Sequence, residues 1–231
     1  MKIAIISDSH DNVPNLEKAL GWINSQGISL IIHCGDLCAP SMLSKVIVPN
    51  FEGKIHLVHG NVGDPKLLEE VAKSFPNVTV HGQVGELEIE YPSPFGDNAS
   101  HFEKMHRRRV RGKIAFTHYP EQGKKLAETQ KYALVFYGHT HKPWIQKYGL
   151  TQTKTEAATD KSPRKSVLSP RKSVLLVNPG TLAGMFYKAT FAIYDTETDP
   201  SPSGDKNAIA FLKKNASPLG EGLELKILEL L

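Results

Sequence analysis

The stretch KIAIISDSH, residues 2–10, decides the fold class of this chain. Its first half is short, apolar and rich in isoleucine, which predicts a buried strand over Lys2–Ser7. Two polar residues that can bind metals, Asp8 and His10, follow where this strand ends. Because apolar residues then recur at helical spacing over Val13–Gln26, the segment opens a strand–helix unit of an α/β fold.

The first half of the chain repeats this strand–helix pattern. The predicted helix over Val13–Gln26 has Asn12 as its N-cap and Gly27 as its end. Two more helices are predicted, one near Ser41–Val48 and one that begins at Asp64 and Pro65. The strands expected between these helices are Ser29–His33, Lys54–His59 and Asn77–His81.

The second half is richer in strands and contains two polar segments. We interpret the chain as one domain, residues 1–231, with insertions at about 92–112 and 151–173. The second insertion holds a tandem heptad, SPRKSVL at 162–168 and again at 169–175, for which a disordered loop is favoured over phosphorylation sites. The expected strands are GELEIEY (85–91), KIAFTH (113–118), ALVFYGH (133–139), PWIQKYG (143–149), SVLLVNPG (173–180), KATFAIYD (188–195) and LELKILEL (223–230).

The net charge of +4 is unevenly distributed. Eleven of the 28 basic residues lie in two runs without acids, 104–113 and 161–172, which leaves 17 basic residues against 24 acidic ones elsewhere. The arginine-rich run suggests contact with nucleic-acid phosphates, but without interleaved aromatic residues a solvated insertion is favoured. Net charge is therefore a poor guide to the partner of this protein.

Other features exclude several classes of protein. No run of about 18 apolar residues is present, and the chain begins directly with a strand, so neither a membrane span nor a leader is expected. The only cysteines, Cys34 and Cys38, form neither a disulfide framework nor a CxxC pair. We expect both to be reduced, Cys34 to be a buried strand residue, and the protein to be cytoplasmic.

Side chains that can bind metals follow five of the predicted strands. Because the carboxyl ends of strands in an α/β sheet open onto one edge, these side chains are expected to converge. Oxygen and imidazole ligands without thiolate suit Mn²⁺, Fe²⁺, Zn²⁺ or Ni²⁺. The seven residues are Asp8 and His10 in DSH, Asp36 in CGD, Asn61 in GN, His118 in TH, and His139 and His141 in GHTH.

Seven converging ligands predict a site for two metal ions. Two divalent cations, two aspartates and a bridging hydroxide leave a charge of about +1, which would attract a phosphate ester. Metals about 3.5–4 Å apart lower the pKa of the bridging water and hold both oxygens of an in-line displacement at phosphorus. The predicted chemistry is attack by a metal-bridging hydroxide, with Asn61 as a candidate for stabilising the transition state.

In order and spacing, DSH, CGD, GN, TH and GHTH resemble the metal-binding motifs of the calcineurin-like metallophosphoesterase superfamily. The short chain, and the absence of histidine after Asn61, resemble its small prokaryotic YfcE-like phosphodiesterase branch, which is related to the retromer scaffold subunit. The match covers Lys2–Lys142, interrupted by the first insertion, and resumes at NPGT, residues 178–181.

This resemblance implies a fold and a ligand assignment. The fold would be a four-layer αββα sandwich, with two central mixed β-sheets flanked by helices, and the metal most often used would be Mn²⁺. One metal would be bound by Asp8, His10 and His141, the other by Asn61, His118 and His139, with Asp36 as the bridge.

Two positions depart from the family pattern. Larger members have a histidine after the asparagine that assists the leaving group, whereas this chain has Val62, which favours substrates with good leaving groups or protonation by water. Tyr119 and Pro120 follow His118 where relatives often have glycine, which would reshape the substrate pocket.

The remaining histidines are interpreted as structural. His33 and His56 lie within strands and are expected to be packed or hydrogen-bonded, and His101 and His106 fall in the first insertion. His59 and His81 end strands, so a place at the pocket stays open for them.

The sequence therefore predicts a two-metal phosphoesterase that acts on a small phosphate ester, with phosphodiesters preferred over phosphomonoesters through the branch resemblance. Two alternatives remain. One is a non-catalytic scaffold of the same fold that binds proteins, and the other is a nuclease that uses the basic insertions to bind nucleic acid. The sequence leaves the natural substrate and the oligomeric state open.

Overall fold

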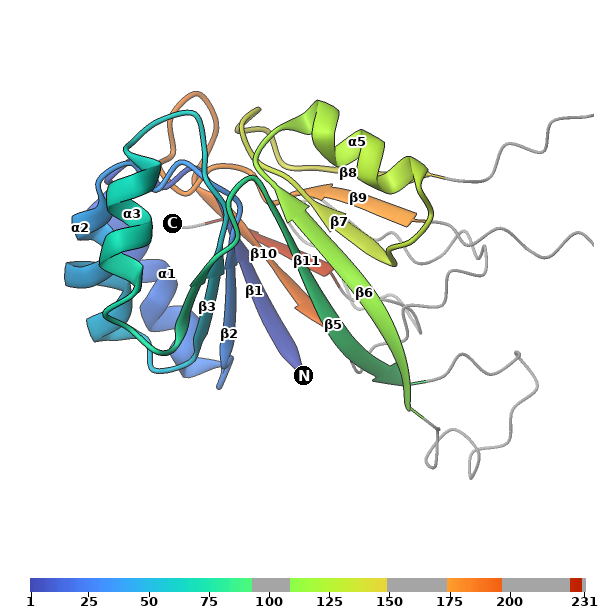
Figure 1. Ribbon diagram of the computed structural model, residues 1–231, viewed down its shortest axis with the longest axis horizontal. Helices are drawn as coiled ribbons and strands as arrows, with labels where there is room; N and C mark the ends of the chain where they lie inside the picture. Colours follow the sequence, from blue (N-terminus) through green and yellow to red (C-terminus); the bar gives the residue numbers. More distant parts are fainter. Residues whose placement is uncertain (93–108, 149–173, 197–224, 230–231) are drawn as a thin grey trace, which may run out of the picture.

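Two mixed β-sheets pack face to face at the centre of the molecule, and helices cover their outer faces (Figure 1). The computed structural model describes residues 1–92, 109–148, 174–196 and 225–229. In the view of Figure 1, α1, α2 and α3 lie on one side of the sheets and α5 lies on the opposite side. This arrangement confirms the predicted four-layer αββα sandwich.

The first sheet has six strands in the order β11-β10-β1-β2-β3-β4. Strands β1 to β4 run parallel, as the repeated strand–helix pattern predicts, while β10 pairs antiparallel with both β1 and β11. Each parallel strand therefore delivers its carboxyl end to the same edge. The bounds are β1 Lys2–Ile6, β2 Leu30–His33, β3 Lys54–Leu57, β4 Val78–Val80, β10 Thr190–Asp195 and β11 Leu225–Glu229.

Two helices on the first sheet begin at the predicted capping residues. Helix α1 (Val13–Ser25) starts after Asn12, whose side chain accepts a hydrogen bond from the backbone N–H of Asn15. Helix α3 (Pro65–Ala72) starts after Asp64, whose side chain accepts from two backbone N–H groups. Such caps satisfy donors that have no partner inside the helix.

The helix predicted near residues 41–48 is irregular in the structure. It consists of a short helix α2 (Pro40–Met42), a wide π turn (Leu43–Ile47) and a narrow 3-10 turn (Val48–Asn50). Pro49 has no N–H to donate, and its ring would clash with the carbonyl one turn earlier in a regular α-helix. The sequence pattern located this segment correctly but did not show that proline distorts its end.

The second sheet has five strands in the order β5-β6-β7-β9-β8. Strand β6 begins at Arg109, so residues 109–112, expected in the first insertion, pair with β5 instead. Helix α5 (Pro120–Glu128) packs on this sheet, although the sequence led us to expect mainly strands here. The strand bounds are β5 Val84–Pro92, β6 Arg109–Thr117, β7 Leu134–Phe136, β8 Trp144–Tyr148 and β9 Val174–Asn178.

Three apolar clusters fill the three interfaces between the four layers. Alternation along β1 sends Ala4 and Ile6 toward the helices α1 and α3, and Ile3 and Ile5 toward the second sheet. The third cluster joins the second sheet to α5 through residues such as Ala127. Burial of these side chains on both faces of each sheet explains why the strands read as nearly continuous apolar runs.

Most of the two predicted insertions, together with the first SPRKSVL heptad, lies outside the described residues. Among the helices that the structure describes, none is both long enough and apolar enough to cross a membrane.

Candidate metal centre

All seven predicted ligands meet at the edge formed by the carboxyl ends of the strands. Five of the seven have a positive φ, between 40° and 69°, which non-glycine residues rarely adopt. At His139 this conformation belongs to a three-residue turn, in which the N–H of Thr140 donates to the carbonyl of Gly138. Strain of this kind persists where the surrounding structure fixes the backbone, and it gathers at functional sites. The five residues are Asp8, His10, Asp36, His139 and His141.

One half of the centre, which we call the closed half, consists of Asp8, His10 and His141. The Nε2 atoms of the two histidines lie 3.2 Å apart. Asp8 Oδ1 is 3.2 Å from His141 Nε2 and 3.8 Å from His10 Nε2. Asp8 is fully buried, and the two histidine side chains are only 11–15% exposed.

The other half, which we call the open half, consists of Asn61, His118 and His139. Asn61 Oδ1 lies 2.8 Å from both His118 Nε2 and His139 Nδ1, and these two nitrogens are 3.3 Å apart. His118 is buried, but Asn61 and His139 are exposed. The open half is therefore the side of the centre that solvent and solutes reach.

Asp36 joins the two halves through a single oxygen. Its Oδ2 atom lies 3.7 Å from His10 Nε2 in the closed half and 3.5 Å from His118 Nε2 in the open half. The other oxygen, Oδ1, accepts a hydrogen bond from the backbone N–H of Val62. The carboxylate is thus oriented so that one oxygen faces both halves.

The donor set fits two cations. Ligand atoms about 2.1 Å from one cation lie roughly 3.0–3.4 Å from one another at right or tetrahedral angles, close to the separations in each half. In the part of the chain that the structure describes, the buried Asp8 Oδ1 has no hydrogen-bond donor. His118 Nδ1 contacts the carbonyl of Cys34 at 2.9 Å, so it carries the proton, and Nε2 presents a lone pair to the acceptor oxygen of Asn61. A cation between these groups would resolve both conflicts.

Hydrogen bonds behind the ligands fix their orientation. The contact from His118 Nδ1 to the Cys34 carbonyl sets the tautomer and the plane of that ring. Asp8 Oδ2 accepts from the Ser7 hydroxyl at 2.5 Å and from the backbone N–H of His139 at 3.1 Å. The hydroxyl of Thr181 donates to the Asp8 carbonyl. These hydrogen bonds therefore hold the side chains in the orientation that brings their ligand atoms together.

Burial changes the protonation of the ligands. Desolvation and, to a smaller extent, the neighbouring charge of Asp36 together raise the pKa of the Asp8 carboxyl to about 6, against the lowering effect of the hydrogen bond from Ser7. Desolvation also lowers the pKa of His118 below its ordinary value, which keeps this imidazole neutral and able to bind a cation. A bound cation would favour the ionised form of Asp8.

Two glycines let the backbone approach the ligands closely. A Cβ atom at Gly60 would lie 1.9 Å from Asp36 Oδ1, and one at Gly138 would lie 2.1 Å from the Ser7 hydroxyl. Neither space can hold a larger side chain unless a ligand or its support moves. The sequence showed glycine before Asp36, Asn61 and His139 but not which contact each permits.

Three further residues contact the ligands, of which the sequence analysis placed only Tyr119 near the pocket. Cys38 Sγ lies 3.4 Å from His10 Nδ1. The Tyr119 ring packs against His118 and His139, with ring centroids 5.1 and 5.6 Å away. The Phe186 ring lies 5.7 Å from that of His141. The contacts of Cys38 and Phe186 join segments that are far apart in the chain, so the spacing of the motifs carries no signal for them.

Of the other histidines, the structure describes His33, His56, His59 and His81, while His101 and His106 lie outside the described residues. His33 is buried and contacts the Ser9 hydroxyl, and His56 contacts His81 at 2.8 Å, as expected for packed strand residues. His59 lies 3.2 Å from Glu69. Among the described residues, none of these histidines belongs to the groups that could hold a metal ion. Those groups are Asp8, His10 and His141, and Asp8, Asp36 and His118.

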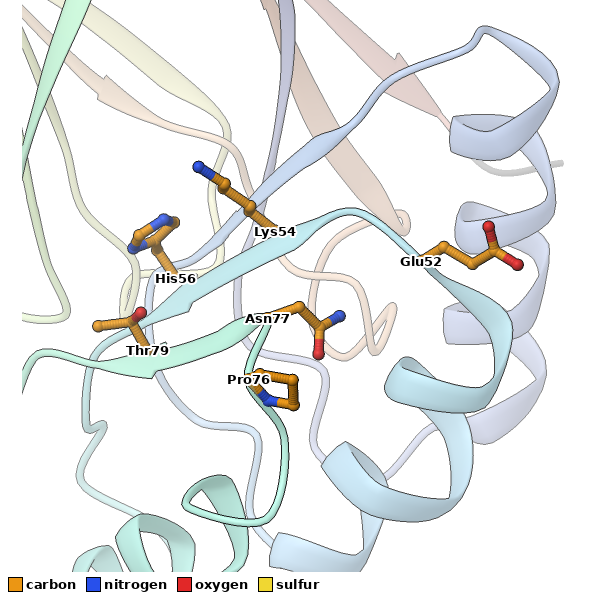
Figure 2. A pocket seen from close by; sticks show the side chains of 6 residues that line it. All are labelled: Glu52, Lys54, His56, Pro76, Asn77 and Thr79. Carbon is orange, nitrogen blue, oxygen red and sulfur yellow. The ribbon is translucent and has the colours of Figure 1, made fainter.

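A separate pocket of about 550 Å³ lies near the opposite ends of β3 and β4 (Figure 2). Its lining includes Lys54, His56 and Thr79, of which the last two are register partners on adjacent strands. Asn61 follows the carboxyl end of β3, so this pocket is not part of the candidate metal centre.

Residues 1–199 match the model of the calcineurin-like phosphoesterase superfamily domain. The chain belongs to this superfamily. The match confirms the predicted superfamily, whose members use divalent metals, and the chain contains candidate groups of metal ligands.

Similarity to individual proteins is consistent with this superfamily assignment. The chain is 26% identical over 199 residues to phosphodiesterase MJ0936 of Methanocaldococcus jannaschii, which covers 85% of this chain and 94% of the relative. A solved archaeal phosphodiesterase is 23% identical with a TM-score of 0.56, covering 85% of this chain and 94% of its own. The phosphoesterase YfcE of E. coli is 16% identical with a TM-score of 0.50, covering 84% and 88%. The two structures support the fold.

Part of the first basic run is paired with acids. Arg111 Nε lies 3.3 Å from Glu90 Oε1, and Lys113 Nζ lies 3.9 Å from Glu86 Oε2, so strand β6 faces acidic residues on β5. Two basic side chains of this run therefore lie in exposed ion pairs with acidic side chains of β5.

Proposed function

We propose that this protein is a two-metal phosphodiesterase that hydrolyses small phosphate esters. The observation that carries the proposal is the position of Asp36 Oδ2, which faces a histidine nitrogen of the closed half at 3.7 Å and one of the open half at 3.5 Å. A carboxylate oxygen placed in this way suits a ligand shared by two cations. The similarity to a phosphodiesterase supports diesters as the substrate class.

The residues of the site would have two roles, binding of the cations and contact with the phosphoryl group. The closed half and the open half would each hold one divalent cation, most commonly Mn²⁺, with Fe²⁺, Ni²⁺ and Zn²⁺ as alternatives. Bound cations supply positive charge and lower the pKa of water, so that hydroxide is available at neutral pH. Asn61 and His139, which are exposed, lie where a phosphoryl group would enter. Asn61 is a candidate for stabilising negative charge on that group in the transition state.

The position of Val62 sets the choice of leaving group. Val62 is 46% exposed beside the open half, and its backbone N–H is engaged by Asp36. Its side chain has no proton to give to a departing alkoxide. We therefore propose that esters with good leaving groups, such as aryl phosphodiesters, react fastest.

An assay with bis(p-nitrophenyl) phosphate tests the proposal. The full chain is stripped with a chelator and reloaded separately with Mn²⁺, Ni²⁺, Fe²⁺, Zn²⁺ or Mg²⁺, and its turnover is compared with that of p-nitrophenyl phosphate. We expect turnover only with a divalent cation, diester turnover above monoester turnover, and a loss of about 100-fold or more in His139→Ala.

His56→Ala is the matched control, because it removes a histidine from a pair away from the ligands. It is expected to keep wild-type turnover. Equal rates in the stripped, reloaded and His139→Ala proteins would contradict the proposed site. A reloaded protein that hydrolyses neither ester would point instead to a non-catalytic scaffold.

A further inference from the structure

Phe186 is the most exposed large apolar side chain in the described part of the molecule. It is 87% exposed, while the next large apolar residue, Trp144, is 47% exposed. Exposing a whole phenylalanine ring to water forfeits the stabilisation that its burial would give. Its neighbours Met185 and Tyr187 are also exposed, at 43% each, so the tip of this loop presents three large side chains to solvent.

The base of this loop is held in place by hydrogen bonds. The N–H groups of Leu182 and Ala183 donate to the carbonyls of Ser7 and Asp8, at 2.9 and 3.0 Å. The Asn12 side chain donates to the Ala183 carbonyl at 2.9 Å. The base of the loop is thus tied to the turn that carries the ligands Asp8 and His10.

Phe186 itself has a strained backbone. Its φ is 64°, and the N–H of Tyr187 donates to the carbonyl of Met185 around it, which forms a three-residue turn. The positive φ marks the rarer, strained form of this turn. The same kind of turn orients His139 in the open half. The strained backbone of Phe186 and the 87% exposure of its side chain both cost stability in the protein alone.

A contact between two rings connects the loop to the candidate metal centre. The ring centroids of Phe186 and His141 are 5.7 Å apart, and His141 Nε2 faces Asp8 in the closed half. A phosphoryl group held at the centre would therefore have one ester substituent beside the Phe186 ring. Aromatic rings stack favourably at such separations.

Resting on the proposed function, we infer that Phe186 determines specificity by stacking on an aromatic ring carried by an ester group of the substrate. The substrate class is then a phosphate ester with an aryl group or a nucleobase next to the scissile phosphate. The residue takes no part in the chemistry itself, and its role is to hold the ring.

Binding of stable anions tests this inference without turnover. Titration calorimetry on the Mn²⁺-loaded full chain compares phenylphosphonate with methylphosphonate, and adenosine 5′-monophosphate with ribose 5-phosphate. We expect the wild type to prefer the ring-bearing member of at least one pair by about tenfold. The pair that shows the preference distinguishes an aryl group from a nucleobase.

Three variants separate stacking from other effects. Phe186→Ala should abolish the preference while leaving methylphosphonate affinity within about twofold, and Phe186→Leu, which keeps an apolar side chain without a ring, should lose most of it. Leu67→Ala, which removes an exposed apolar side chain from α3, should retain it. Equal affinities within both pairs, or a preference that survives in Phe186→Ala, would overturn the inference alone. Failure of the wild type to bind any of these anions would overturn the proposed function as well.

Discussion

The closed and open halves of the candidate metal centre differ in how the protein surrounds them. In the closed half, the Asp8 side chain is fully buried, and no group among the described residues donates a hydrogen bond to its Oδ1 atom. In the open half, Asn61 and His139 face solvent, and only His118 is buried. The two halves share Asp36 but would present very different environments to a cation.

This difference suggests a division of roles. A buried carboxylate and two nearly buried imidazoles would hold a cation that exchanges slowly, because water has little access to the ligands. Exposed ligands would hold a second cation that exchanges faster and that a substrate can reach. The predictions below either separate the two halves or affect both of them through the shared ligand.

Asp36→Asn is expected to have the largest effect. It removes the negative charge that faces both halves while preserving the shape of the side chain. Phosphodiesterase activity should fall by about 1,000-fold or more, and the bound Mn²⁺ should drop from two ions per chain to one or fewer. The measurement pairs steady-state kinetics with elemental analysis. Two tightly bound ions and near-normal turnover would show that Asp36 is not shared.

His139→Ala is expected to separate the halves. The variant loses a ligand only from the open half, so it should keep one firmly bound Mn²⁺ per chain and lose activity by about 100-fold or more. Timed treatment of the wild type with a weak chelator should likewise release one ion well before the other. Simultaneous release of both ions would contradict the distinction between a closed and an open half.

Gly60→Ala is expected to displace Asp36, the ligand that the two halves share. Because the new Cβ would lie 1.9 Å from Asp36 Oδ1, the carboxylate must move, and Mn²⁺ affinity should fall by about 10- to 100-fold. Gly21→Ala in α1 is the matched control, since a Cβ there meets open space. The control should bind Mn²⁺ normally and be slightly more stable. Similar behaviour of both variants in calorimetry would argue against tight packing at Asp36.

Acid should weaken metal binding through the closed half. Burial raises the pKa of Asp8 to about 6 without metal, so below pH 6 a proton competes with the cation for this carboxylate. One competing proton weakens Mn²⁺ binding by up to about tenfold per pH unit as the pH falls from 6, with little change through this group above pH 7. Titrations between pH 5 and 8 measure the slope. A flat profile through this range would refute the role assigned to Asp8.

His56→Ala is expected to have the smallest effect. The His56–His81 contact lies beside the pocket of Figure 2, away from the candidate ligands. Mn²⁺ content should stay at two ions per chain, and kcat/KM should change by less than about twofold. A large loss of metal or of turnover would show that the centre extends beyond the seven predicted residues.

The local elements of the first sheet were predictable from sequence patterns, whereas the four layers were predicted from the resemblance to the superfamily. Apolar alternation in β1 and the helix caps at Asn12 and Asp64 are local properties, and the structure reproduces them. Helix α5 escaped prediction because its sequence, PEQGKKLAE, contains Gly123 and few apolar residues. That glycine lets the helix approach Leu176 of β9, a tertiary contact with no local signal.

For the candidate site, the sequence predicted which residues converge but not the contacts between them. The positions of the seven residues after strands indicated convergence, because parallel strands share an edge. The strained φ values, the support from Ser7 and Thr181, and the contact of Cys38 with His10 depend on segments far apart in the chain. Spacing along the sequence cannot encode such contacts, so the sequence predicted the residues of the candidate metal centre but not their geometry.

Anomalous diffraction from crystals grown with Mn²⁺ tests the central claim most directly. Data collected near the manganese absorption edge locate the ions without reference to the ligands. Two peaks are predicted on either side of Asp36 Oδ2, one among Asp8, His10 and His141 and the other among Asn61, His118 and His139. A single peak, or peaks away from these residues, would contradict the two-metal centre.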